Sequence, residues 1–220
     1  MKVLQQSVVF RKATAEALID IEEAGRTCYR SENKITEHSS EEFVRKIIKR
    51  GHESVLEHAS ASFKIVCDRG ISHEIVRHRL ASFSQESTRY VKYGQLEVIL
   101  PPTLNNETWK NIYGTYLPVY INEVSESSLL FSSISSWIRS CLVAEKCYCE
   151  MLDAGERPEI ARSVLPTCTR TELVMTCNFR EWRHFLRMRH ALAAHPQVRE
   201  VAGIVKLWFK ENYPVIIEDI

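Results

Sequence analysis

The chain has 220 residues, of which 45% are hydrophobic and 26% are charged, and these proportions are typical of a globular protein with a sizeable core. The formal net charge of +1 argues against a protein that coats nucleic acid by bulk electrostatic attraction. The sequence has no apolar stretch of about 18 residues and no basic segment followed by an apolar one near Met1. We therefore expect a soluble, cytoplasmic protein with no membrane span, built as a single domain over residues 1–220.

A helix is predicted over residues 39–51, because its apolar side chains share one face. Ser39 and Glu42 have the spacing of a capping box, and Gly51 is expected to end the helix. Residues 59–68 then alternate between apolar and polar side chains, which predicts a half-buried strand.

Residues 71–79 are predicted to form a short helix, so the stretch 77–90 begins on a helix end and continues as a loop. A serine-rich segment over residues 125–155 carries apolar residues at helical spacing, Leu130 among them, and predicts a long amphipathic helix that ends at Gly155. It is not expected to be a flexible tether.

The remaining elements lie in the last third of the chain. They are a brief helix between Pro158 and Pro166, a strand over residues 171–178, and helices over residues 179–190 and 196–214. The sum is a helix-rich α+β protein with a small sheet.

Seven cysteines are scattered along the chain without a C-x-x-C pair, the closest two being Cys147 and Cys149. This spacing indicates neither a disulfide framework nor a zinc site, so we expect reduced thiols. His73 and His78 are five residues apart, which turns the second about 140° from the first on a helix, so they cannot share a metal from one face. No bound metal is expected.

Glycine-based phosphate loops are absent, because the seven glycines stand too far apart for a G-x-G-x-x-G or a P-loop. Any phosphate must then be held by side chains. Between Lys146 and Lys206 the chain has eight arginines and no lysine. Because guanidinium is planar and forks onto phosphate, this bias indicates oriented anion recognition, with solvated helix faces as the alternative for part of the set.

Two clusters of polar residues are candidates for a site. In "RHRLASFSQESTRY", residues 77–90, Ser87 and Arg89 point the same way if extended and could hold a phosphate; an ion-paired surface loop is the alternative. In "GHESVLEH", His52 and His58 are candidates, although a lone histidine is more often structural.

A third cluster lies on the helix over residues 179–190. Its apolar stripe starts at Phe179 and is continued ten residues later by Arg189, so this arginine should end in a pocket or interface rather than in water. Arg180 and His184 are four apart and could grip a ligand together. The alternative is a basic helix end that the helix dipole favours.

Taken together, these stretches resemble one known family. "RHRLASFSQESTRY" fits the R-H-R, seven residues, S-x-R-Y signature of the flavin-dependent thymidylate synthases. "GHESVLEH", "ARSVLP" and "NFREWRHFLRMR" are similar to three further family elements, and the spacing agrees over roughly residues 50 to 200.

The resemblance implies a homotetramer of α+β subunits, each with a small, mostly antiparallel sheet flanked by helices, whose active sites are shared between chains. It implies FAD as cofactor and the conversion of dUMP to dTMP, with methylenetetrahydrofolate as carbon donor and NADPH as reductant. No nucleic acid or membrane partner is implied. No cysteine lies inside a matching motif, which agrees with a route that needs no enzyme thiol.

Residue roles follow by position in the matching motifs. Those implied for the flavin are His52, Ser54, Arg77, His78, Arg79, Gln85, Asn178, Arg180 and His184. Those implied for the nucleotide are Glu74, Arg77, Gln85, Glu86, Ser87, Thr88, Arg89, Arg162 and Arg189. Arg189 is the implied catalytic residue, lying against the uracil and favouring its ionised form, and Ser87 is assigned to phosphate binding.

The chain departs from the common S-x-N-E-x-S pattern, since Ser84 and Gln85 stand at the Asn and Glu positions. Gln85 keeps the length and hydrogen bonding of glutamate without its charge. The alternative functions are a non-catalytic nucleotide- or RNA-binding module and a helical interaction protein without a ligand. The near-zero net charge and the lack of an RNA-binding motif disfavour the RNA-binding module.

Overall fold

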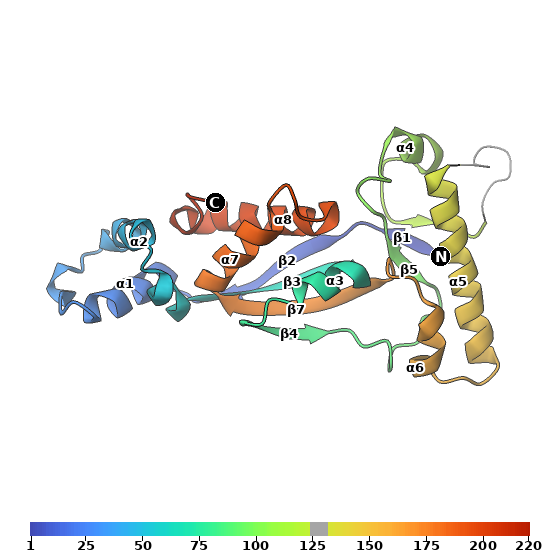
Figure 1. The fold of residues 1–220 in the computed structure, drawn as a ribbon, viewed down its shortest axis with the longest axis horizontal. Helices are drawn as coiled ribbons and strands as arrows, with labels where there is room; N and C mark the ends of the chain where they lie inside the picture. The colour runs from blue at the N-terminus through green and yellow to red at the C-terminus, as the bar shows by residue number, and fades with distance from the viewer. Residues whose placement is uncertain (124–131) are drawn as a thin grey trace. The chain divides into compact units, whose positions relative to one another are not determined.

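The computed structural model describes residues 1–123 and 132–220 and has an α+β fold (Figure 1). Two compact units make up the chain. Unit 1 consists of Met1–Ser7, Val66–Glu74 and Gln85–Leu173, and unit 2 consists of Val8–Ile65, Ile75–Ser84 and Val174–Ile220. None of the described helices is long and apolar enough to cross a membrane. That residues 1–220 act as one domain stays a prediction.

Unit 1 contains a three-stranded sheet and the longest helix. Its three-stranded sheet has the spatial order β5 (Glu97–Ile99), β1 (Lys2–Leu4), β6 (Val119–Tyr120). Its helices include most of α3 (Arg69–Ile75), α4 (Glu107–Tyr113), α5 (Ser133–Asp153), α6 (Pro158–Ala161) and the 3₁₀ turn η3 (Arg162–Val164). Strand β1 pairs parallel to β5 and antiparallel to β6. Val3, Val98, Trp109 and Ile138 are buried together and join the sheet to α4 and α5.

The second sheet has the strand order β2 (Ser7–Ala13), β3 (Ser60–Asp68), β7 (Arg170–Asn178), β4 (Ala81–Gln85). Backbone bonds from Phe179 to Ala59 and from Arg69 to Thr169 join opposite ends of β3 and β7, so these strands run antiparallel. The predicted α+β fold with an antiparallel sheet is confirmed, and the parallel β1–β5 pair is an addition to it.

Helices of unit 2 pack on this sheet and beside one another. They are α1 (Ala17–Thr27), η1 (Glu32–Lys34), α2 (Ser39–Lys49), η2 (Glu53–His58), α7 (Phe179–Arg189), α8 (Pro196–Asn212) and η4 (Pro214–Ile216). Figure 1 shows α7 and α8 next to each other, and the two are in contact. The ring of Phe63 on β3 lies 5.0 Å from that of Trp182 on α7 and 5.1 Å from that of Trp208 on α8, so both helices cover one face of β3.

The predicted helix over residues 39–51 is confirmed as α2, with Gly51 at φ +72° beyond its end. The capping box is wrong. Ser39 is the first helical residue rather than the cap, and its Oγ accepts from the Thr36 backbone N–H at 2.9 Å and lies 2.7 Å from the Glu22 carboxylate. The Ser39 hydroxyl, which the spacing predicted to cap α2, is therefore bound by Glu22 on α1 instead.

The strand over residues 59–68 is confirmed as β3, but it is not half-buried. Ser62 and Asp68, on the predicted polar face, are only 3% and 6% exposed. Ser62 Oγ accepts a hydrogen bond of 2.8 Å from Thr176 Oγ1 on β7, so the neighbouring strand satisfies its polar atom.

The segment after β3 differs from the prediction at two points. Helix α3 (Arg69–Ile75) is shorter than residues 71–79, so Arg77 and Arg79 lie in the turn that follows it. Residues 81–85 form strand β4 rather than a loop, because their backbone pairs with β7.

The later helices are largely as predicted. Helix α5 begins at Ser133 and is followed by Gly155 at φ +92°, while Leu130 lies outside the described residues. The brief helix after Pro158 is confirmed as α6, and the helices predicted over residues 179–190 and 196–214 are confirmed as α7 and α8.

Candidate functional site

The residues assigned from the sequence fall into two groups, one in each unit. The unit 2 group contains His52, Ser54, Arg77, His78, Arg79, Asn178, Arg180, His184 and Arg189, and the unit 1 group contains Glu74, Gln85, Glu86, Ser87, Thr88, Arg89 and Arg162. Each group is built from segments that are distant in the sequence.

A buried histidine is the centre of the unit 2 group. His78 is 5% exposed, its Nδ1 lies 2.9 Å from the Glu181 carboxylate, and its Nε2 lies 3.1 Å from Nε of Arg189. Because the guanidinium can only donate, Nε2 is the acceptor and Nδ1 carries the hydrogen that Glu181 accepts. Burial lowers the pKa of His78, more than the nearby Glu181 raises it, which agrees with this neutral tautomer.

His78, Glu181 and His184 offer three ligand atoms within 4.8 Å of one another, a spacing that a metal ion could use. Both nitrogens of His78 are already engaged, however, and one of them faces the Arg189 cation. A metal ion would have to displace that guanidinium and overcome its repulsion. The chemistry of the cluster therefore fits a hydrogen-bonded network better than a metal centre.

Helix α7 positions the remaining members of the unit 2 group. Asn178 is its N-cap and accepts from the Glu181 backbone N–H at 2.9 Å, which leaves its amide nitrogen for another acceptor. His184 is exposed, and its ring centroid lies 5.5 Å from that of His78. Arg180 pairs with Glu57 at 2.6 Å, but both side chains are about half exposed, so this pair can be exchanged for a ligand anion at little cost.

Arg189 lies half-buried at the end of α7. The prediction that it ends in a pocket or interface rather than in water is confirmed in part, because the side chain is half-buried and its Nε reaches the buried His78.

Arg183 was missed by the sequence analysis and supports this site from within. Its side chain is fully buried and binds Glu53 at 2.9 Å, Asp219 at 2.7 Å and the carbonyl oxygen of Ile216. Glu53 belongs to η2, between His52 and Ser54, so the ion pair fastens that segment to α7. Its position one turn after Phe179, on the apolar face of the helix, is the signal that could have identified it.

Two residues of the unit 1 group, Thr88 and Arg162, line a cavity of about 450 Å³. Arg162 donates from Nη1 to Thr88 Oγ1 at 3.1 Å on its wall, and Arg69 and His73 of α3 line it as well. Two guanidiniums and a hydroxyl that converge on one cavity match the donor set of a phosphate site. Arg69 and His73 were missed, although their i, i+4 spacing on one helix could have indicated a shared face.

Ser87 and Arg89 are not extended, so that part of the prediction is wrong. Backbone bonds from Tyr90 and Val91 to the Ser87 carbonyl fold these residues into a turn. The Arg89 guanidinium lies 5.1 Å from the centroid of the Tyr90 ring.

Gln85 and Glu86 have structural partners inside unit 1. Gln85 Nε2 donates to Ser72 Oγ at 2.9 Å and to Thr171 Oγ1 at 3.1 Å, which uses both of its donors. Glu86 forms an ion pair of 2.5 Å with Arg170. The carboxylate of Glu86 is therefore held by Arg170 and by the Tyr93 hydroxyl, and the charge missing at Gln85 is not replaced at that position.

The two groups define a class of site: cavities and surfaces of guanidinium, imidazole and hydroxyl donors, suited to phosphates and flat polar rings. Comparison with known proteins gives this class a family. The sequence matches the family described as "Thymidylate synthase complementing protein" over residues 11–215. The chain belongs to this family.

Its relatives carry a more specific name. The chain is 34% identical to the flavin-dependent thymidylate synthase of Corynebacterium efficiens, with 93% of this chain and 79% of that protein covered. It is 36% identical to the one from Corynebacterium glutamicum, covering 86% and 72%, and 35% identical to a probable one from Mycobacterium phage L5, covering 90% and 78%.

A solved structure is also similar. It is the UMP/dUMP methylase PolB from Streptomyces cacaoi bound with 5-Br dUMP, with a TM-score of 0.77, 27% identity, and coverage of 98% of this chain and 95% of that one. The family predicted from the motifs is therefore confirmed.

Proposed function

We propose that this protein is a flavin-dependent thymidylate synthase that methylates dUMP to dTMP, with methylenetetrahydrofolate as carbon donor and NADPH as reductant through FAD. The observation that carries the proposal is the contact between Arg189 and His78 in a chain of this family. A structural relative named as a UMP/dUMP methylase supports it.

The nucleotide phosphate is assigned to the unit 1 cavity. Arg162 and Thr88, already joined at 3.1 Å, would both bind it, and Arg69 adds a second guanidinium. A dianionic phosphate gains charge-assisted hydrogen bonds from such donors. Ser87 and Arg89 are proposed to contribute from the adjoining turn, together with Glu74, Gln85 and Glu86, and Arg77 is assigned to the nucleotide from the family motif alone.

Arg189 is the proposed catalytic residue. Reaction at C5 of uracil requires electron density on the ring, and a cation at the N3 and O2 edge stabilises the negative charge as it develops. Neutral His78 accepts a hydrogen bond from Nε of Arg189 at 3.1 Å, which fixes the orientation of the guanidinium that is proposed to meet the pyrimidine. His78 is thus a positioning residue for Arg189 as well as a candidate contact of the flavin.

The donor set of the unit 2 group fits a flavin. His78 and His184 offer imidazole rings, Arg180 has an exchangeable guanidinium, and the Asn178 amide nitrogen has no partner among the residues that the structure describes. His52, Ser54, Arg77 and Arg79 complete the proposed flavin-binding set, and Gln85 is assigned to it from the family motif. When bound, the flavin supplies the redox chemistry that carries reducing equivalents from NADPH. The protein's part is to bind, orient and exclude water. No resident metal is proposed.

The same proposal includes a homotetramer with shared active sites, in the cytoplasm, without nucleic acid or membrane partners. Light scattering of the purified protein tests the tetramer, and a mass of one chain, 25.5 kDa, would contradict it.

Release of tritium from 5-tritiated dUMP tests the function. Purified protein with FAD, NADPH and methylenetetrahydrofolate should release tritium and form dTMP, and leaving out any one component should stop the reaction. A folded protein that binds neither FAD nor dUMP would refute the proposal.

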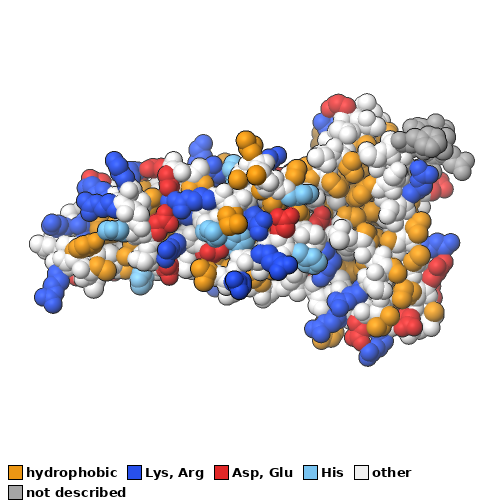
Figure 2. Space-filling model, viewed as in Figure 1, with side chains coloured by type: hydrophobic (Ala, Val, Ile, Leu, Met, Phe, Trp, Pro, Cys, Tyr) orange, Lys and Arg blue, Asp and Glu red, His pale blue; other side chains and the backbone are white. Residues whose placement is uncertain are grey.

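A non-catalytic nucleotide- or RNA-binding module would instead be colourless and would bind RNA in a salt-dependent way. On the face that Figure 2 shows, basic side chains are interspersed with acidic ones rather than gathered into a stripe, which favours the enzyme.

A further inference from the structure

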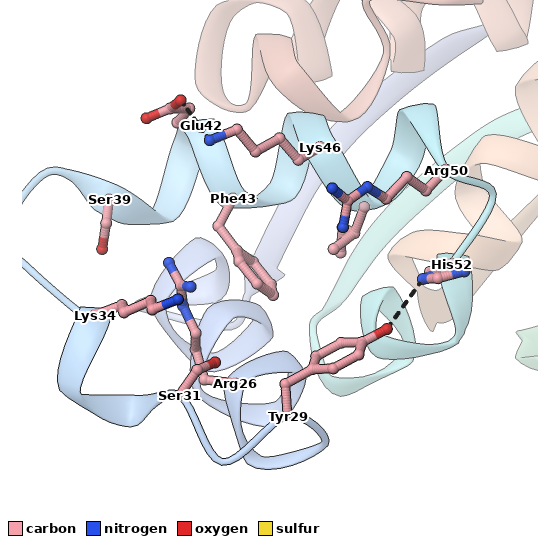
Figure 3. Close-up of a pocket in the computed structure, with 11 residues that line it drawn as sticks. Arg26, Tyr29, Ser31, Lys34, Ser39, Glu42, Phe43, Lys46, Arg50 and His52 are labelled. Carbon is pink, nitrogen blue, oxygen red and sulfur yellow. Dashed lines mark hydrogen bonds and ion pairs between the residues drawn. The ribbon is translucent and has the colours of Figure 1, made fainter.

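A second cationic cavity lies within unit 2, between α1 and α2. Its volume is about 400 Å³, and Arg26, Lys34, Lys46, Arg50 and His52 line it (Figure 3). Among the described residues that line this α1–α2 pocket, only Glu42 is acidic. Except for His52, none of these cations belongs to the site assigned above.

The charges in the α1–α2 pocket do not balance. Arg26 is paired with the buried Glu22 at 2.7 Å, and Lys46 is paired with Glu42 at 2.6 Å. Lys34 and Arg50 are exposed, and their side chains have no hydrogen-bonding or ion-pairing partner in the part of the chain that the structure describes. Two positive charges are therefore available, which matches a ligand with at least two negative charges.

Aromatic rings form another part of the pocket. Phe43 points from α2 toward α1, where the Arg26 guanidinium lies 4.6 Å from its ring centroid (Figure 3). Gly25 makes this approach possible, since a Cβ there would lie 2.5 Å from Cζ of Phe43. The Tyr29 hydroxyl lies 3.4 Å from Nδ1 of His52. Flat apolar faces thus lie beside the unpaired cations.

We propose that the α1–α2 pocket binds the polyanionic, ring-bearing end of a co-substrate, with Lys34 and Arg50 as its anion-binding residues. A cavity of this volume holds part of a dinucleotide or folate rather than the whole molecule. The identity of the ligand rests on the proposed function, which supplies two sources of this chemistry: the phosphorylated adenosine of NADPH and the glutamate-bearing benzoyl group of methylenetetrahydrofolate. His52 connects the pocket to the proposed flavin site.

Binding of the isolated ligand ends tests the proposal without turnover. Adenosine 2′,5′-bisphosphate and p-aminobenzoyl-triglutamate are titrated separately by calorimetry into protein saturated with FAD. One of them should bind with one site per chain, and Lys34→Gln and Arg50→Gln should each weaken it about tenfold, as expected for a lost hydrogen bond to a charged group. The probe that responds identifies the source.

Lys49→Gln is the matched control, because Lys49 is an exposed cation on the same helix that does not line this pocket. It should leave binding unchanged. If neither probe binds the FAD-saturated protein, or if Lys49→Gln weakens binding as much as the pocket variants do, the assignment is overturned. In turnover, both pocket variants should raise KM for the identified co-substrate about tenfold and leave KM for dUMP unchanged.

The two proposals fail separately. Tritium release by the unmodified protein depends on the proposed function alone. If the protein binds no FAD, the titrations are repeated on the unloaded protein, and binding that Lys34→Gln and Arg50→Gln weaken would still establish the pocket.

Discussion

Arg189, at the C-terminal end of α7, donates from Nε to Nε2 of His78 over 3.1 Å, and the histidine is 5% exposed. A buried neutral imidazole fixes the guanidinium without cancelling its charge, whereas a carboxylate would cancel it. This contact joins segments that are 111 residues apart in the sequence. It orients the Arg189 guanidinium, the kind of cation that stabilisation of an electron-rich pyrimidine requires.

Replacing Arg189 should separate chemistry from cofactor binding. We expect Arg189→Ala to lower the rate of tritium release at least about a hundredfold, the scale of losing one preorganised donor at a developing charge, while FAD remains bound and coloured. Arg189→Lys keeps the charge but not the planar geometry and should be intermediate. Arg139→Ala, an exposed arginine on α5, serves as the control. Full activity of Arg189→Ala would remove the catalytic assignment.

His78 should make stability depend on pH below neutrality. In the unfolded chain its imidazole titrates near 6.5, whereas burial holds its pKa lower in the folded protein. Below about pH 6.5 the unfolded state therefore binds more protons, and the free energy of unfolding falls as the pH drops through this window. Urea unfolding at pH 7.5 and pH 5.5 should show a larger loss for the parent than for His78→Gln. An equal loss in both proteins would contradict this account.

Arg162 should contribute through the phosphate alone. We expect Arg162→Ala to raise KM for dUMP by roughly 10- to 100-fold, since a hydrogen bond to a charged group contributes about 1.5–3 kcal/mol. Thr88→Val should have a smaller effect, because a neutral hydroxyl is lost. Deoxyuridine, which has no phosphate, should be equally poor with the parent and both variants. If Arg162→Ala impaired the reaction of dUMP and of deoxyuridine to the same extent, Arg162 would support the fold rather than bind the phosphate.

Local signals were sufficient where only neighbouring residues decide the conformation. The positive φ of Gly51 and Gly155 ends α2 and α5 where glycine was expected to end them. The Ser39 capping box failed because Glu22, 17 residues earlier, takes its hydroxyl. Strand β4 was missed because pairing with β7, which the local pattern does not report, holds residues 81–85 extended.

The candidate site divides in the same way. The apolar stripe of α7 predicted that Arg189 would end in a pocket or interface. The periodicity of one helix cannot predict that the hydrogen-bond partner there is His78. The motifs predicted which residue types lie at the site. The strand β7 partners of Gln85 and Glu86, which are Thr171 and Arg170, could not be predicted from them. Arg183 was missed because an arginine is expected to be exposed to solvent. Its burial depends on Glu53 and Asp219, which are distant in the sequence.

Arg183 and Arg187 allow a matched test of that buried ion pair. Both bind Glu53 and Asp219, but Arg183 has a fully buried side chain and Arg187 is 43% exposed. Arg183→Leu leaves the two carboxylates without their buried partner and should lower the free energy of unfolding by about 3 kcal/mol. Arg187→Leu removes a solvated pair and should cost at most about 1 kcal/mol. Urea unfolding measures both.

The same variants should differ in flavin binding. Because Glu53 stands between His52 and Ser54, loss of Arg183 releases η2 from α7 and should weaken FAD binding, while Arg187→Leu should not. Arg183→Lys keeps a cation at this buried position and should restore part of the stability if Arg183→Leu fails to fold. Equal losses from the two leucine variants would mean that the buried position of Arg183 does not determine its contribution, and η2 would then have to be held by packing alone.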